Sequence, residues 1–274
     1  MRTIWRLIKL SFFTGVALLF YAAFVEPYML DTTPYVVENN ALSGVKIVFA
    51  TDFHIAPYPW EKWRLQRIVR KINEQNPDLV ILGGDYVSGH EEASTMAPQE
   101  IAEALREITA PKVAVLGNHD SYYGKEDVVK ALKNVDIPVL DNQNIRLRVK
   151  DRWITVAGVS DLSSDKPDVE KALKNAVAPV IFVTHSPDVL PQVKGRAVLT
   201  LAGHTHGGQI VLPFVGAPLV PSDYGQRYRY GMISEQNTLM LVSSGLGTSL
   251  LPLRFNSKPE IVEVSFRGFF NNRR

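Results

Sequence analysis

The sequence predicts an α/β fold in which two β-sheets pack as a sandwich flanked by helices. In the first half of the chain, short apolar strands alternate with helical segments whose apolar residues recur at positions i, i+3, i+4 and i+7. This β-α-β-α-β-α order predicts a parallel sheet with helical cover. Beyond residue 145 strands dominate, which predicts the second sheet. With 274 residues, 46% of them hydrophobic, the chain is long enough to bury such a core.

The apolar pattern also locates the individual elements. In the first half it predicts strands at 45–50, 79–82 and 113–116 and helices at 65–72, 101–108 and 128–135. Pro77, Pro111 and Pro138 each stand between a helix and the next strand, where a helix has to stop. In the second half the pattern predicts strands at 145–149, 153–157, 180–184, 198–202, 239–243 and 261–266. The segment 213–230, rich in proline, glycine and tyrosine, is expected to form a long loop close to the functional site.

The N-terminus differs from the rest of the chain. An apolar run over 10–25 follows three basic residues, Arg2, Arg6 and Lys9. As a helix, this run would span about 24 Å, slightly less than the roughly 30 Å hydrocarbon core of a bilayer. A cleaved signal peptide is the main alternative, but no clean cleavage site closes the run, because Tyr21 is bulky where a small residue is needed. A buried core helix is a weaker alternative. We therefore expect an uncleaved single-pass membrane anchor.

These features divide the chain into four parts. We expect the anchor over 1–26, a linker with a short strand at 35–37 over 27–44, the globular domain over 45–266, and a tail over 267–274. Basic residues before a membrane helix favour a cytoplasmic N-terminus, so the domain is expected on the outer side of the membrane.

Composition narrows the chemistry. The net charge is only +2, which argues against a dedicated nucleic-acid binder, because contact with phosphates normally requires a basic excess. The chain has no cysteine, so disulfides, thiolate metal sites and a cysteine nucleophile are excluded. Any metal ion must therefore be held by His, Asp, Glu and Asn.

Ligand-competent residues follow the predicted strands at the end where open α/β sheets bind their ligands. They are Asp52, His54, Asp85, Asn118, His185, His204 and His206. In an extended segment residues i and i+2 point to the same side, so pairs such as Asp52 and His54 can reach one metal. A single such residue is more often a turn, a cap or a surface group. Five of the six histidines recur at strand ends, however, which predicts a shared metal site. We interpret the sixth, His90, as a surface loop residue.

Together these motifs resemble those of the calcineurin-like metallophosphoesterase superfamily. The matching segments are Asp52-x-His54, Gly83-Gly84-Asp85, Gly117-Asn118-His119-Asp120, His185 and Gly203-His204-Thr205-His206. They lie in the family's order between residues 45 and 266, so the resemblance makes this span a catalytic domain. The wider sequences around His185, His204–Gln209 and Arg254–Glu260 resemble a bacterial membrane-associated branch. That branch includes phosphodiesterases and the UDP-diacylglucosamine pyrophosphohydrolases of lipid A synthesis, and it implies an inner-membrane location.

The resemblance also implies how the ligands divide between two metal ions. Asp52, His54 and His206 would hold one ion, and Asn118, His185 and His204 the other, with Asp85 bridging both. Independently, two ions about 3.5–4 Å apart need a shared anionic ligand, which a carboxylate can be and an imidazole cannot. Imidazole and carboxylate ligands suit Mn, Fe or Zn, and without thiolates we favour Mn.

The expected mechanism is attack on phosphorus by a hydroxide that bridges the two metals. His119 adjoins a ligand without being one, which suits it to protonating the leaving oxygen. Asp120 is expected to orient that imidazole, or alternatively to cap a helix. Asp161 is a further candidate for supporting the site or touching the substrate.

Substrate recognition is less determined by the sequence. Gly245–Gly247 can approach a phosphate or simply form a turn. Arg254 is either a phosphate-binding fork or a surface salt bridge. The segment 224–230 and the pair Trp60 and Trp63 can contact the bilayer, although buried packing is equally consistent for the two tryptophans.

We expect a hydrolase of phosphodiesters or pyrophosphates, acting on a small-molecule or lipid-linked substrate such as UDP-2,3-diacylglucosamine. A metal-binding scaffold without turnover, a phosphomonoesterase and a nuclease are the alternatives. The complete set of ligands plus His119 favours the enzyme, and the low net charge disfavours the nuclease. UDP-2,3-diacylglucosamine would be met on the cytoplasmic face, in conflict with the outward orientation that the basic residues predict, unless the anchor only dips into the membrane. The sequence does not predict the oligomeric state.

Overall fold

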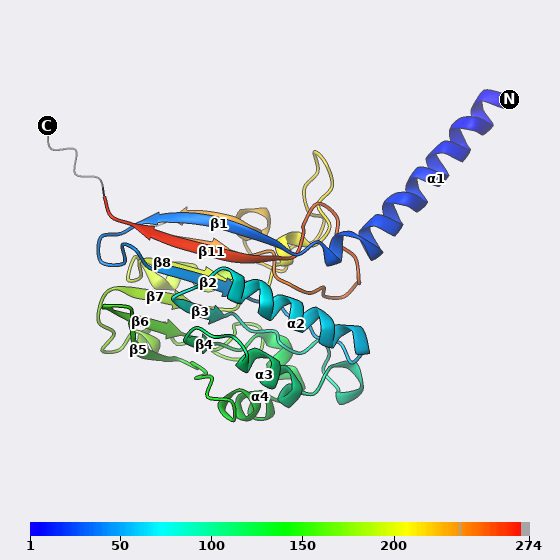
Figure 1. Cartoon of the computed structure of the whole chain (residues 1–274). Helices are drawn as coiled ribbons and strands as arrows, with labels where there is room; N and C mark the ends of the chain where they lie inside the picture. The colour runs from blue at the N-terminus through cyan, green and yellow to red at the C-terminus, as the bar shows by residue number, and fades with distance from the viewer. Residues whose placement is uncertain (236, 270–274) are drawn as a thin grey trace, which may run out of the picture.

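The computed structural model describes residues 1–235 and 237–269, which form two packed β-sheets (Figure 1). The five-stranded sheet has the order β1 (Asp31–Glu38), β11 (Glu260–Arg267), β2 (Lys46–Ala50), β3 (Leu79–Leu82) and β4 (Lys112–Ala114). The six-stranded sheet has the order β5 (Gln143–Val149), β6 (Arg152–Gly158), β7 (Val180–Val183), β8 (Leu199–Ala202), β10 (Thr238–Val242) and β9 (Gly231–Glu235). The predicted two-sheet α/β sandwich is thus confirmed.

Helices cover the outer face of the five-stranded sheet (Figure 1). These are α2 (Pro59–Glu74), α3 (Pro98–Arg106) and α4 (Asn118–Lys133). Two single-turn helices, α5 (Val169–Ala172) and α6 (Leu190–Val193), follow strands of the other sheet. Short 3-10 turns occur at η1 (Glu26–Tyr28), η2 (Glu92–Ser94), η3 (Pro187–Val189), η4 (His206–Gly208) and η5 (Gly225–Tyr228).

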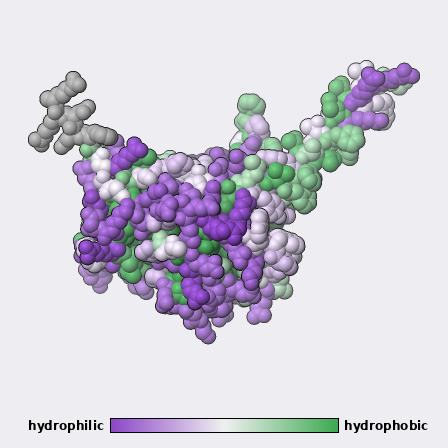
Figure 2. All heavy atoms as spheres, in the orientation of Figure 1, coloured by the Kyte–Doolittle hydropathy of each residue, from purple (hydrophilic) through white to green (hydrophobic). Residues whose placement is uncertain are grey.

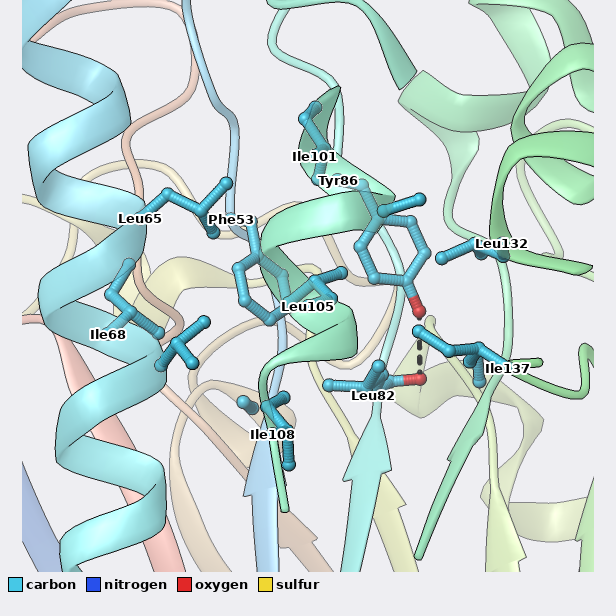
Figure 3. Close-up of a cluster of buried hydrophobic side chains, with 14 of the residues drawn as sticks. Phe53, Leu65, Ile68, Leu82, Tyr86, Ile101, Leu105, Ile108, Leu132 and Ile137 are labelled. Atoms are coloured by element: carbon cyan, nitrogen blue, oxygen red, sulfur yellow. Dashed lines mark hydrogen bonds between the residues drawn. The ribbon is translucent and has the colours of Figure 1, made fainter. Parts of the chain in front are cut away.

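The alternation of side chains along β2 explains why the sheet has two buried faces. Ile47 and Phe49 point into the core between the two sheets, whereas Val48 and Ala50 point into the core beneath the helices. Helical side chains fill that second core, and those labelled in Figure 3 are Leu65, Ile68, Ile101, Leu105 and Leu132. Because both faces are covered, the strands are continuous apolar runs, and this made them recognisable in the sequence.

Strand direction brings several loops to the same edge of the sandwich. Strands β2, β3 and β4 are parallel to one another. Strands β6, β7, β8 and β10 are likewise parallel. The carboxyl ends of parallel strands meet at one edge of a sheet, which is where open α/β sheets bind ligands.

Helix α1 (Arg2–Phe24) projects from the body of the molecule, and its surface is largely apolar (Figures 1 and 2). It begins well before the predicted apolar run, and its 23 residues span about 35 Å. The stretch Arg2–Tyr28 is long and apolar enough to cross a membrane by length and composition, with a mean hydropathy of 1.9.

The segment 27–44 is not a free linker, which corrects the expectation from the sequence. Strand β1 pairs in parallel with β11 along its whole length, from Asp31 opposite Glu260 to Glu38 opposite Arg267. Only a three-residue strand was predicted here, because an edge strand with one exposed face carries a weak apolar pattern. Pro34 is tolerated because the strand lies at the edge.

Two other boundaries differ from the prediction. Strand β9, inside a segment with no predicted strand, pairs antiparallel with β10 as an edge hairpin. The predicted tail over 267–274 begins one residue too early, since Arg267 ends β11, and its last five residues lie outside the described residues.

Candidate metal centre

Seven side chains converge where the strands of the two sheets end. Asp52 and His54 follow β2, Asp85 follows β3, and Asn118 opens α4 directly after β4. From the other sheet, His185 follows β7, and the pair His204 and His206 follows β8. We refer to these seven residues as the metal floor. Its members are buried or half-buried, as expected for groups that hold an ion away from bulk water.

The metal floor contains two adjoining groups of donor atoms. Donor atoms of Asp52, His54 and His206 lie within 4.8 Å of one another. Those of Asp85, His185 and His204 form a second group of the same size. Asp85 joins the groups, because its Oδ2 lies 3.4 Å from His54 Nε2 and 3.1 Å from His185 Nε2. This is the position that a bridging ligand occupies. Asn118 lines the same cavity as Asp85 and His204.

Donor atoms of the metal floor face one another, and some of them have no hydrogen-bond partner, which is an arrangement that bound cations would satisfy. The Nε2 atoms of His54 and His206 lie 3.2 Å apart. His185 Nε2 approaches Asp85 without hydrogen-bond alignment, and this atom and Asn118 Oδ1 are buried without a hydrogen-bond partner among the described residues. Buried polar atoms are normally paired, because leaving them unpaired is costly. Imidazole, carboxylate and amide donors without thiolate suit divalent Mn, Fe or Zn. The residues present therefore fit two such ions.

Electrostatics differ between the two groups. Burial holds the pKa of His54 and of His206 well below the ordinary value, so both imidazoles are neutral and have a lone pair to donate. Burial also opposes the charge on His185, but the nearby carboxylate of Asp85 outweighs it and raises the pKa of His185. The same pairing holds the pKa of Asp85 well below its ordinary value despite its burial.

The backbone of the metal floor is not extended, which corrects the geometric argument used for the i, i+2 pairs. Asp52, His54, Asp85, His204 and His206 all have positive φ, between 43° and 70°. Non-glycine residues rarely adopt this left-handed conformation, and clusters of them mark functional sites. The left-handed turns also send His204 and His206 to different groups of ligands.

Gly84 permits the close approach that this geometry requires. Its φ is +93°, and a Cβ there would come within 2.4 Å of the backbone nitrogen of Gly117. Any side chain would therefore push apart the two loops that carry Asp85 and Asn118.

His119 lies at the edge of the metal floor. Its ring centroid is 4.6 Å from that of His54, and its backbone N–H donates to Asp85 Oδ1 at 2.8 Å. Its Nδ1 lies 2.9 Å from the carbonyl oxygen of Ser88. A carbonyl only accepts, so Nδ1 carries the proton and Nε2 is left to exchange one with a ligand.

Asp120 does not orient His119, contrary to the prediction from the sequence. Its carboxylate accepts backbone N–H groups of Asp85 at 2.7 Å, Tyr86 at 2.8 Å and Gly117 at 2.9 Å. It therefore caps the start of α4, as the alternative proposed, and also fixes the Asp85 turn. Burial, together with the charge of Asp85, raises the pKa of Asp120.

Sequence reasoning missed two residues beside the site. His90 is exposed as predicted, yet its ring lies 5.0 Å from that of His119 and 5.0 Å from that of Tyr122. Arg64 donates to the carbonyls of Phe53 and His54 and so buttresses the first metal-binding turn. No local pattern singles out either residue, because their partners are distant in sequence.

Arg254 is neither a phosphate fork nor a surface ion pair. It is fully buried and donates to the carbonyl oxygens of Gly247, Ser257 and Ser244. Gly247 N–H in turn donates to the carbonyl of Asp52. The 245–247 turn therefore packs against the metal floor and supports it, and the hydrogen bonds from Arg254 hold that turn in place.

The structure also places the remaining residues that the sequence suggested as contacts for the substrate or the membrane. Asp161 is buried, and its charge contributes to the raised pKa of His185. Trp60 and Trp63 are exposed rather than packed inside. Within 224–230, Tyr228 is buried while its stacking partner Tyr224 faces solvent.

A two-sheet sandwich with two joined groups of His, Asp and Asn donors at its strand ends defines a metal-dependent phosphoesterase. The sequence model of that class matches as well. Residues 45–208 match the calcineurin-like phosphoesterase family, to which the chain belongs. The matched span begins with β2 and ends just past His206, so it contains the entire metal floor.

Two relatives of similar sequence support the same placement, and a solved structure shares the fold. The chain is 34% identical to the uncharacterized metallophosphoesterase YkuE of Bacillus subtilis over 90% of this chain and 89% of that protein. It is 33% identical to the phosphodiesterase YaeI of Escherichia coli, with 82% of each chain covered. The NAD nucleotidase NadN of Haemophilus influenzae superposes on 74% of this chain and 50% of its own, with a TM-score of 0.51 at 15% identity. This last likeness concerns the fold alone.

Proposed function

We propose that the protein hydrolyses phosphodiester or pyrophosphate bonds in an amphiphilic, lipid-linked substrate such as UDP-2,3-diacylglucosamine. The observation that carries the hydrolytic part is His119. It lies among donor atoms of His54 and Asp85, it is not needed to complete either group of ligands, and its Nδ1 is held by Ser88. A histidine placed in this way is suited to deliver a proton to a leaving oxygen.

The residues of the chain divide the work of hydrolysis. Asp52, His54 and His206 would hold one ion, Asn118, His185 and His204 the other, and Asp85 both. When bound, the ions supply Lewis acidity towards the phosphoryl oxygens and a water that ionises near neutral pH. The Ser88 carbonyl accepts the Nδ1–H of His119 and fixes the ring, so that with both ring nitrogens protonated the Nε2–H would pass to the leaving oxygen and leave His119 neutral. Asp120 holds the Asp85 turn in its strained conformation.

The scarcity of cationic side chains around the metal floor favours phosphodiesters, and pyrophosphates substituted at both ends, over phosphomonoesters. Two cavities of about 620 Å³ and 400 Å³ adjoin the metal floor, and Leu250 and Leu251 line both of them. Among the described residues that line them, Arg64 is the only lysine or arginine, and its guanidinium is engaged by carbonyls. A dianionic terminal phosphate would benefit from a further cation, whereas a diester carries a single charge per phosphate and a group on each side.

The proposed ions are manganese, because the ligands combine imidazole nitrogens with three oxygen donors, Asp52, Asp85 and Asn118, and include no thiolate. Helix α1 is proposed as an uncleaved anchor in a bacterial inner membrane. Its end is integrated into the domain, since Ala22 is buried and its carbonyl accepts the N–H of Arg254. The basic residues before it favour an external domain. A C-terminal alkaline phosphatase fusion tests the orientation. Activity is expected and would make the substrate another lipid-linked phosphoester of the outer face, whereas inactivity would place the domain on the cytoplasmic face, where UDP-2,3-diacylglucosamine is met.

The hydrolytic proposal is tested with full-length protein in detergent, reconstituted with Mn²⁺, Fe²⁺ or Zn²⁺. We expect about two ions per chain and faster hydrolysis of bis(4-nitrophenyl) phosphate than of 4-nitrophenyl phosphate. The variant His119→Ala is expected to lose about 100-fold with an alkoxide leaving group and much less with 4-nitrophenolate, which leaves without a proton. Absence of hydrolysis with every metal, or an equal loss for both leaving groups, would contradict the proposal or the role of His119 respectively.

A further inference from the structure

Two loops beside the metal floor expose apolar side chains to an unusual extent. Phe214 is 109% exposed and Leu250 is 87% exposed, and the side chains of Val215, Leu219 and Leu251 are also exposed. We call these five residues the apolar rim. Single exposed apolar residues are common, but a contiguous exposed patch marks an interaction surface. The loop that carries Phe214, Val215 and Leu219 is the yellow loop of Figure 1. It projects beside the base of α1, and its tip is apolar (Figure 2).

Hydrogen bonds join the two loops of the apolar rim into one structure. The side chain of Gln209 donates to the carbonyls of Ser249 and Leu251 and accepts the N–H of Ser249. Val211 N–H donates to the carbonyl of Phe255. The rim is therefore held in place from beneath while its apolar side chains remain outside.

The apolar rim is continuous with the end of α1. The N–H of Ser257 donates to Glu26 at 2.6 Å, and the N–H of Arg254 donates to Ala22 at 2.9 Å. One cavity is lined both by Ala23 and by Leu250. If α1 crosses a bilayer, its C-terminal end lies at the membrane interface, and these contacts fix the rim at the same level.

Neighbouring residues have the chemistry of that interface. Trp60 and Trp63, at the start of α2, are exposed, and Trp60 stacks on Tyr58 with ring centroids 4.6 Å apart. Arg67 lies 5.8 Å from the Trp63 ring and donates to the carbonyl of Tyr28. Exposed aromatic rings beside cations are typical of the headgroup region of a membrane.

The inner side of the apolar rim is a wall of the metal cleft. The cavity of about 400 Å³ is lined by Leu219, Leu250 and Leu251 and also by His119 and members of the metal floor. The apolar rim, which would meet the lipid, and the metal floor therefore line the same cavity.

From this arrangement we infer that the apolar rim inserts into the bilayer surface and admits an acylated phosphoester directly from the membrane to the metal floor. The occupant of the rim is thus the lipid bilayer. The identification of the entering lipid as substrate rests on the proposed function, whereas the docking of the rim does not.

The absence of native cysteine allows a direct test of docking in the full-length protein. F214C and L250C are labelled with an environment-sensitive fluorophore and reconstituted into phosphatidylglycerol–phosphatidylethanolamine vesicles. W153C is the control, because Trp153 is an exposed aromatic residue on β6, remote from α1. Lipid-attached nitroxides should quench both rim labels and spare the control. Equal quenching by aqueous iodide at all three positions would overturn the inference, as would protection of the rim by a second copy of the chain without lipid quenching.

The double variant F214S/V215S tests access of the substrate. Neither residue lines the cavities at the metal floor, so hydrolysis of bis(4-nitrophenyl) phosphate should be unchanged. KM for an acylated phosphoester embedded in vesicles should rise about tenfold, because less apolar surface inserts. An unchanged KM would overturn lipid entry at the rim. If wild-type protein hydrolyses no ester at all, the proposed function fails, while the fluorescence result stands by itself.

Discussion

The metal floor and the apolar rim lie side by side, yet their residues are held in opposite ways. In the metal floor, side chains are buried, and Asp85 is fixed by hydrogen bonds from the N–H of His119 and to the carboxylate of Asp120. Rim residues such as Phe214 and Leu250 are exposed, and the loop of Leu250 is held through the backbone carbonyls of Ser249 and Leu251, which accept from Gln209.

The difference teaches which part of the site can vary. The floor residues contact one another, and five of the seven adopt a left-handed backbone, so a change there would disturb both ions and the fold around them. A change at the exposed tips of the rim, such as Phe214 and Val215, mainly removes contacts with what lies outside the protein. The floor therefore determines the reaction, and the rim determines which substrates reach it.

The largest effect is expected from Asp85→Asn. The amide cannot serve as an anionic bridge between the two groups of ligands, so activity on soluble and vesicle-bound substrates should fall together by about 10³-fold or more. Metal analysis should show loss of at least one ion per chain. Asp136→Asn is the matched control, because Asp136 also has positive φ but is exposed. Retained activity in D85N would contradict the role of Asp85 as a bridging ligand that catalysis requires.

A smaller and more selective effect is expected from Leu250→Asn in the rim. Leu250 has a φ of 62°, which asparagine tolerates, and its side chain is exposed, so the free energy of unfolding should change by less than about 0.5 kcal/mol. Activity on the vesicle-embedded substrate should fall by about tenfold. Thermal denaturation and vesicle assays measure the two quantities. A large loss of stability would show that the rim is part of the core and not a docking surface.

The smallest effect concerns pH and distinguishes the two halves of the metal floor. Metal binding needs neutral imidazole. The pKa of His185 is raised, so a proton competes with the metal there as pH falls through neutrality, whereas the lowered pKa of His54 and of His206 keeps those rings neutral. At limiting Mn²⁺, metal content should fall from about two ions per chain near pH 8 to about one near pH 6.

His185→Gln provides the comparison for that measurement. It should bind about one ion at both pH values, because the titrating ligand is gone. Parallel loss of both ions from the wild-type protein as pH falls would show that the two halves titrate as one unit.

Much of the fold was predictable because its signals are local. The strands that carry Asp52 and Asp85 are buried on both faces and so appear as short apolar runs, and the helices repeat apolar residues every turn. Strand β1 gave little signal because it is an edge strand whose partner, β11, lies at the other end of the sequence. The predicted orienting role of Asp120 and both predicted roles of Arg254 were wrong for the same reason: their partners are backbone groups of loops brought near only by folding.

By itself, the sequence determined the sandwich, the apolar N-terminal segment and the seven candidate ligands. The apolar pattern of each strand and the residue types that follow it depend only on neighbouring positions in the sequence. Only the tertiary structure decided how those ligands divide in space, since left-handed turns at residues such as His204 and His206 depend on the loops packed around them. It also decided that the exposed leucines and Phe214 form one rim beside α1. That rim exists because hydrogen bonds join segments that lie far apart along the chain.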